Sequence, residues 1–117
     1  MSRDRRGGAR LRAARAVLLG ATLLAGTACG SRARPRGHAV SIRSFQFAPA
    51  ALEVAVGDTV TWTNHDFVPH TATASDGSFD TRSIGTEASA SVVIRRRGQT
   101  TYRCTFHPAM TGSVTTP

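Results

Sequence analysis

The chain has 117 residues, with 15 Arg and no Lys against 7 acidic residues, and a formal net charge of +8. Six of the Arg and one Asp lie in residues 1–28, so residues 29–117 carry nine Arg and six acidic residues, a net charge of +3. This modest surplus removes the main argument for nucleic-acid binding. About 80 residues remain from His38 onward, which is enough for one domain with a packed core.

An export signal is predicted over residues 1–28. A basic segment, residues 1–15, precedes an apolar run, residues 16–25. A run of about ten residues is too short to remain as a membrane span and is typical of a secretory signal peptide. The pair Arg5 and Arg6 also raises the twin-arginine export route, although the small residues that follow are atypical of it, so the sequence leaves the route open.

Cys29 follows the apolar run directly, after small residues at positions 26–28. This arrangement is similar to the processing site of bacterial lipoproteins, in which the cysteine is lipidated and becomes the first residue. We expect lipidation of Cys29; the alternative is ordinary secretion with cleavage near Ala28, because Gly26 stands where lipoproteins usually have an aliphatic residue. Residues 29–37 are predicted to form a flexible tether whose arginines can lie against anionic lipid headgroups.

Apolar residues alternate with polar ones along residues 38–117, a period that indicates strands and not helices. The parity changes near Arg43 and Ser44, where we expect a β-bulge. The predicted inward-facing residues are Val40, Ile42, Phe45, Phe47, Leu52, Val54, Val56, Val60, Trp62, Ala88, Ala90, Val92, Ile94, Thr100, Tyr102, Cys104 and Phe106. Val114 is assigned to a last short strand. Six or seven short strands separated by turn signals predict an all-β domain, a Greek-key β-sandwich over residues 38–117.

A motif near the C-terminus combines three possible metal ligands. Cys104, His107 and Met110 are separated by two residues each, and they offer a thiolate, an imidazole and a thioether. His70 supplies a second imidazole. Two His, one Cys and a weak axial Met form a set that selects copper, whereas Met is not a usual ligand of zinc. Alternation from Tyr102 places Cys104 inward at the end of its strand.

Two enzyme classes fit the sequence less well than a metal carrier. A cysteine hydrolase would use Cys104 activated by a histidine, but the motifs expected around such a nucleophile are absent. A copper enzyme with a second centre would need more histidines, and only His38 and His65 remain. His65 is interpreted as a solvated turn residue and His38 as an inert residue of the tether. We therefore expect no catalytic residues.

These motifs resemble those of the cupredoxins, small blue-copper proteins, and most closely those of the amicyanin and plastocyanin branch. The short spacing from His107 to Met110 is similar to that of the amicyanin loop. The resemblance covers the chain from about Ala39 to Val114. It implies one copper ion that cycles between Cu(II) and Cu(I), held by His70, Cys104, His107 and Met110.

The resemblance also implies how the surroundings of the ligands act. Thr71 follows the first ligand where these families usually have Asn, and its hydroxyl is expected to bond toward Thr105. An apolar surface around an exposed edge of His107 is expected to serve electron transfer; it comprises His107, Pro108, Ala109, Phe67 and Val68. The run of arginines at 95–97 is placed about 20 Å from Cys104 and is interpreted as a solvated turn, with contact to anionic lipid as the lesser alternative.

The expected function is that of a monomeric carrier of single electrons between membrane-associated redox proteins outside the cytoplasm. The predicted location is the outer face of the cell membrane as a lipoprotein, or the periplasm or medium if Cys29 is not lipidated. The alternative is a cell-envelope protein that binds or delivers Cu(I) with the same ligands. The sequence does not identify the electron donor or acceptor.

Overall fold

The computed structural model describes residues 32–117 together with Gly20, Gly26 and Gly30. The chain divides into two units, Met1–Ser31 and Arg32–Pro117, and the hydrophobic core described below lies in the second. Cys29 and nearly all of the predicted signal peptide lie outside the described residues. Among those that are described, no helix has the length and hydropathy needed to cross a bilayer.

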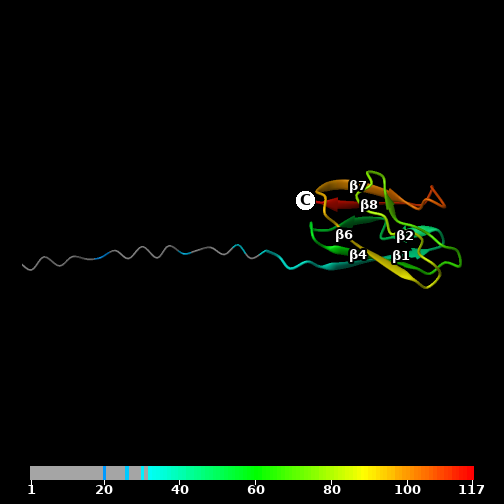
Figure 1. Cartoon of the computed structure of the whole chain (residues 1–117), viewed down its shortest axis with the longest axis horizontal. Coiled ribbons are helices and arrows are strands. Elements are labelled where there is room, and N and C mark those ends of the chain that lie inside the picture. Colours follow the sequence, from blue (N-terminus) through cyan, green and yellow to red (C-terminus); the bar gives the residue numbers. More distant parts are fainter. Residues whose placement is uncertain (1–19, 21–25, 27–29, 31) are drawn as a thin grey trace, which may run out of the picture. The chain divides into compact units, whose positions relative to one another are not determined.

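Two four-stranded sheets pack face to face (Figure 1). The first has the order β2-β1-β4-β6, with β1 (Gly37–Arg43), β2 (Gln46–Ala48), β4 (Thr59–Asn64) and β6 (Ser89–Val93). The second has the order β3-β8-β7-β5, with β3 (Ala51–Glu53), β5 (Thr73–Ala74), β7 (Gly98–Arg103) and β8 (Thr111–Thr116). Strand β1 runs parallel to β4 and β3 runs parallel to β8, while the other pairs are antiparallel. The predicted β-sandwich is confirmed.

Aromatic side chains fill the space between the sheets. The Tyr102 ring of β7 lies with its centroid 4.8 Å from that of Phe47 and 5.4 Å from that of Trp62. Across the β7–β8 pair Tyr102 is in register with Gly112, and a Cβ atom at Gly112 would overlap the tyrosine ring. The packing of the aromatic core therefore requires glycine, which has no side chain, at position 112 of β8.

The segment between β1 and β2 is a turn and not the predicted bulge. Arg43 pairs with Gln46, which leaves Ser44 and Phe45 as a two-residue connection, and these two residues have φ of 49° and 59°. Positive φ at both central residues is typical of tight hairpin turns, although it is unfavourable for side chains of this kind. The turn directs Phe45 outward, with 48% of its surface exposed. The predicted inward position of Phe45 was therefore wrong.

The alternation also fails where strands have ended. Val56 and Phe106 were predicted to face inward but are 43% and 53% exposed, and Ala88 is exposed as well. Val56 lies in the turn before β4, Phe106 in the loop after β7, and Ala88 just before β6. Side chains alternate between faces only while the backbone is extended, so a row of inward residues cannot be continued into a loop.

The sandwich has two ends with different contents. The metal-loop end carries residues 64–70 and 104–110, and the tether end carries residues 34–37, 54–58 and 94–98 with the C-terminus. In Figure 1 the loop that follows β7 lies at the right-hand end of the sandwich and the C-terminus at the left-hand end. Paired strands that run between the ends hold them about 20 Å apart, the length of a six-residue strand.

A buried aspartate organises the tether end. The carboxylate of Asp58 accepts the backbone N–H groups of Arg36 at 2.8 Å and Ala55 at 2.9 Å, and it bonds to Nε2 of His38 at 2.8 Å. These donors lower the pKa of Asp58 from 3.8 to about 2. The sequence suggested that His38 is inert. The structure shows instead that it helps to join the start of β1 to the turn before β4.

Candidate metal centre

Three predicted ligands come together at the metal-loop end. The Sγ atom of Cys104 lies 3.7 Å from Nδ1 of His70 and 3.6 Å from Nδ1 of His107. The three possible donor atoms lie within 4.8 Å of one another. Cys104 and His70 are completely buried, and His107 is only partly buried.

Backbone contacts position each of these side chains. Cys104 directly follows β7, so it keeps the inward parity of Tyr102 two residues earlier. His70 follows the loop after β4, and its backbone N–H and carbonyl both bond to Ile84, at 3.1 Å and 2.7 Å. The sequence separation of His70 and Cys104 is 34 residues, but the packing of the two sheets brings them to the same point.

The loop of residues 104–110 is closed by its own backbone. The N–H of Cys104 donates to the carbonyl of Met110 at 3.1 Å, and the N–H of Met110 donates to the carbonyl of His107 at 2.9 Å. Pro108 fixes its own φ inside the loop. Met110 is buried, with 5% of its surface exposed, and β8 begins at the next residue. The loop therefore returns the chain to the core, with buried Met110 bonded through its backbone carbonyl to Cys104.

The donor set fits one copper ion. First-row metal bonds of roughly 2.0 Å to nitrogen and 2.3 Å to sulfur, at angles between tetrahedral and trigonal, separate the two donors by about 3.5–3.8 Å. The observed sulfur-to-nitrogen distances are 3.7 Å and 3.6 Å. A thiolate with two imidazoles is the combination that suits copper in both of its common oxidation states.

Thr71 ties the two ligand segments together. Its backbone N–H points to Sγ of Cys104 at 3.4 Å. Its hydroxyl oxygen accepts the backbone N–H of Thr105 at 2.9 Å and lies 3.2 Å from the Thr105 hydroxyl. The segment after His70 is thus bonded to the residue after Cys104, which fixes the spacing of both ligands.

Asp66 orients His70 and was not identified from the sequence. Its Oδ2 atom lies 2.9 Å from Nε2 of His70, so the opposite ring nitrogen faces Cys104. The same carboxylate accepts the backbone N–H groups of Ser44 at 2.7 Å and Phe45 at 2.9 Å. Burial raises the pKa of Asp66, but the bonds from Phe45, Ser44 and His70 outweigh it and lower the pKa below its ordinary value. One carboxylate therefore holds both an imidazole and the strained turn.

This β1–β2 turn places the ring of Phe45 against the imidazoles of His70 and His107. Its ring centroid lies 5.2 Å from that of His70 and 4.9 Å from that of His107, with interplanar angles of 86° and 89°. Edge-to-face contacts of this kind are favourable. Phe45 therefore restricts the rotation of the two imidazoles, a role that its predicted inward position did not suggest.

A further missed residue is Asn64 at the end of β4. It is buried, and its side-chain amide donates to the carbonyls of Val68 at 2.8 Å and Ile84 at 2.9 Å. Its side-chain oxygen accepts the N–H of Asp66 at 2.9 Å. These bonds fold the loop that carries both Asp66 and His70. The neighbouring His65 lies 3.6 Å from Glu87 and does not join the metal cluster.

The predicted electron-transfer surface is apolar and mostly exposed. Phe67 is 96% exposed, Pro108 and Ala109 are exposed, and His107 and Val68 are partly buried. Phe106 lies in the same loop as Pro108 and Ala109 and is itself exposed, although it was predicted to face the core. His107 is the most exposed of the three clustered ligands, and it lies next to apolar loop residues.

We expect Asp66→Ala to weaken metal binding by roughly 10–100-fold, because a bond to the far nitrogen of a ligating imidazole fixes its orientation and raises its basicity. Competition with a coloured chelator measures the affinity. Glu87→Ala is the matched control, since Glu87 is an exposed carboxylate near His65. Equal affinities for both variants would contradict a role for Asp66.

The comparison with protein families agrees with this geometry. Residues 37–116 match the model of the copper-binding proteins of the plastocyanin/azurin family. Amicyanin from Paracoccus denitrificans is 31% identical over 80 residues, which cover 64% of this chain. The chain spans 61% of the length of that relative.

Solved structures show the same similarity. A mutant of amicyanin in its oxidised form has a TM-score of 0.64 and 29% identity, over 68% of this chain and 81% of that one. A purple cupredoxin from Nitrosopumilus maritimus has a TM-score of 0.63 and 31% identity, over 68% of this chain and 99% of that one.

Proposed function

This chain belongs to the plastocyanin/azurin family of copper-binding proteins, and we propose that it carries single electrons between redox proteins outside the cytoplasm. The family accounts for one copper ion and for electron transfer. The observation that carries the proposal is the cluster of His70, Cys104 and His107, with donor atoms at distances that fit one ion. Met110, at the closed end of the same loop, is the proposed fourth ligand.

Copper, when bound, supplies a centre that gains or loses one electron between Cu(II) and Cu(I). The protein's part is to keep the ligands in place. Asp66 and Phe45 restrain the imidazole of His70, and Thr71 restrains the thiolate of Cys104. Ligands that barely move between oxidation states require little reorganisation, which favours rapid transfer. Met110 would supply the fourth, weakly held ligand, and its thioether would tune the reduction potential.

A carrier agrees with the remaining histidines better than an enzyme does. His38 bonds to Asp58 at the tether end, and His65 lies close to Glu87. The described residues contain one group of His, Cys and acidic side chains able to hold a metal, and neither histidine belongs to it. We therefore propose no catalytic residues.

Voltammetry combined with absorption spectroscopy tests the proposal. A reversible one-electron couple together with an intensely coloured Cu(II) form supports a carrier. A colourless site that takes only Cu(I) and passes it to an acceptor would overturn the carrier and support copper delivery.

The proposed route of the electron is the exposed edge of His107. Replacing Phe67 or Ala109 by Glu should slow electron self-exchange severalfold. Self-exchange brings the same surface of two molecules into a small contact, as in other weak redox encounters, and the introduced carboxylates would repel each other there. The visible spectrum should not change. Line broadening in NMR spectra of mixed oxidation states measures the rate. Arg96→Glu at the tether end is the control, and equal rates in all three variants would place the route elsewhere.

The proposed location is the outer face of the cell membrane, reached through lipidation of Cys29. The proposal rests on the apolar run and on the small residues before this cysteine. Cys29→Ala should move the protein from the membrane fraction to the soluble fraction or block its processing. Native protein with an unmodified N-terminus near Cys29 would instead indicate a periplasmic or secreted carrier.

A further inference from the structure

The tether end holds the positive surplus of the described residues. Five exposed arginines lie there, namely Arg34, Arg36, Arg95, Arg96 and Arg97, against three acidic residues, namely Glu53, Asp58 and Asp76. At the metal-loop end and beside it three arginines, Arg43, Arg82 and Arg103, balance three acidic residues, Asp66, Asp80 and Glu87. The ninth described arginine, Arg32, precedes Arg34 in the tether, so the excess charge of the domain lies away from the metal ligands.

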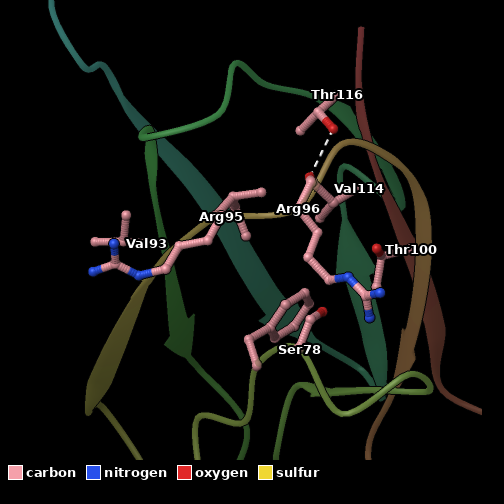
Figure 2. Close-up of a pocket in the computed structure, with 9 residues that line it drawn as sticks. Ser78, Val93, Arg95, Arg96, Thr100, Val114 and Thr116 are labelled. Atoms are coloured by element: carbon pink, nitrogen blue, oxygen red, sulfur yellow. Dashed lines mark hydrogen bonds between the residues drawn. The ribbon is translucent and has the colours of Figure 1, made fainter.

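Two of the three acidic residues at this end are already engaged. Asp58 is buried and bonded to backbone N–H groups and to His38. Asp76 lies 3.4 Å from Nη1 of Arg96 and 3.5 Å from the hydroxyl of Thr100. Figure 2 shows Arg95 and Arg96 leaving the turn after β6 in different directions, with the Arg96 backbone carbonyl bonded to Thr116 at 2.8 Å. The turn thus presents guanidinium groups in different directions; that of Arg96 is paired with Asp76, but the pair is solvent-exposed and therefore weak.

Exposed apolar side chains accompany these arginines. Val56 and Val93 are 43% and 40% exposed. The N–H of Gly57 donates to the carbonyl of Ile94 at 2.7 Å, which joins the turn of Val56 to the segment after Val93. A surface that combines arginines with exposed apolar side chains is typical of proteins that lie on a membrane interface.

The chain also enters the domain at this end. The carbonyl of Arg36 accepts the N–H of Thr59, and β1 begins at the next residue. Seven residues lie between Cys29 and Gly37 in the sequence, and that length of chain spans at most about 30 Å. A lipid on Cys29 would therefore keep this end close to the bilayer.

We propose that the tether end binds the surface of an anionic membrane, with lipid phosphate groups as ligands of the arginines and the metal-loop end turned away. The inference rests on the proposed location, and it adds which end of the carrier faces the bilayer. Guanidinium groups bind phosphate with paired hydrogen bonds.

Vesicle sedimentation tests this surface without the anchor. The unit Arg32–Pro117, which holds both sheets and the core, should bind vesicles of equal parts phosphatidylglycerol and phosphatidylcholine at low salt. It should not bind pure phosphatidylcholine, and high salt should release it. Each arginine near such a surface raises binding about fivefold, so replacing Arg95, Arg96 and Arg97 together by Gln should weaken binding by roughly a hundredfold.

The control replaces Arg43, Arg82 and Arg103 by Gln, an equal change of charge at the other end, and should alter binding less than about twofold. Equal losses of vesicle binding in the two triple variants would mean that only the net charge of the protein matters, and this would overturn the proposal. Binding to an acidic protein partner but not to anionic vesicles would also overturn it. If vesicle binding fails while the Cu(II) spectrum and the voltammetry are normal, the membrane-binding proposal is wrong and the electron-carrier proposal stands. If the copper signals are lost while vesicle binding is normal, the electron-carrier proposal is wrong and the membrane-binding proposal stands.

Discussion

Replacing Cys104 by Ser should abolish the intense visible absorption of the Cu(II) protein. The colour requires charge transfer from a thiolate to copper, and the thiol of Cys104 is the one that lies beside two imidazole nitrogens. A serine hydroxyl is a harder and weaker donor, so affinity for copper should fall as well. The absorption spectrum of the Cu(II)-loaded variant measures the effect.

Met110→Leu is the companion variant. The thioether of Met110 would tune the potential of bound copper more than it would strengthen binding, so the colour should remain while the reduction potential changes. A Cys104→Ser protein that kept its strong visible band would disprove the ligand assignment.

Replacing Gly112 by Ala should lower the free energy of unfolding by roughly 2–3 kcal/mol or more, a typical cost of overpacking a core. A Cβ atom at Gly112 would overlap the Tyr102 ring, which is itself surrounded by Phe47, Trp62 and Phe79. The ring has nowhere to move without displacing β7, the strand that leads into Cys104. Urea denaturation of the metal-free protein measures the change.

Gly37→Ala is the matched control for this variant. Gly37 is exposed in β1, and a Cβ atom there would meet nothing within 4 Å. Its stability should therefore stay within about 0.5 kcal/mol of the parent, as for most surface substitutions. Similar losses in the two variants would indicate a general effect of removing strand glycines.

Most of the ligand cluster could be predicted from the sequence, because strand alternation and the spacing of residues within one loop determine it. Strand alternation placed Cys104 inward, and the short spacing to His107 and Met110 allowed one loop to return both residues. His70 required a further step, since only the packing of two sheets brings it to the same point. The resemblance to a known family supplied that step.

Asp66 and Phe45 could not be predicted, for a related reason. The role of Asp66 depends on a turn 21 and 22 residues earlier in the chain, and neither segment shows by itself that it meets the other. Phe45 alternates correctly with Phe47 if the strand is continuous. Positive φ at Ser44 and Phe45 breaks that continuity, and it becomes tolerable because Asp66 accepts both N–H groups.

The order of the strands leaves β2, β6, β3 and β5 at the edges of the two sheets. Three of these edges are only two or three residues long, and β6 alone reaches five. Short edges offer few free backbone groups to a strand from another molecule, which is one way in which natural β-proteins avoid aggregation. The proposed lipid anchor would bring many copies onto one membrane, and we expect the short edges to keep neighbouring copies from joining into a common sheet.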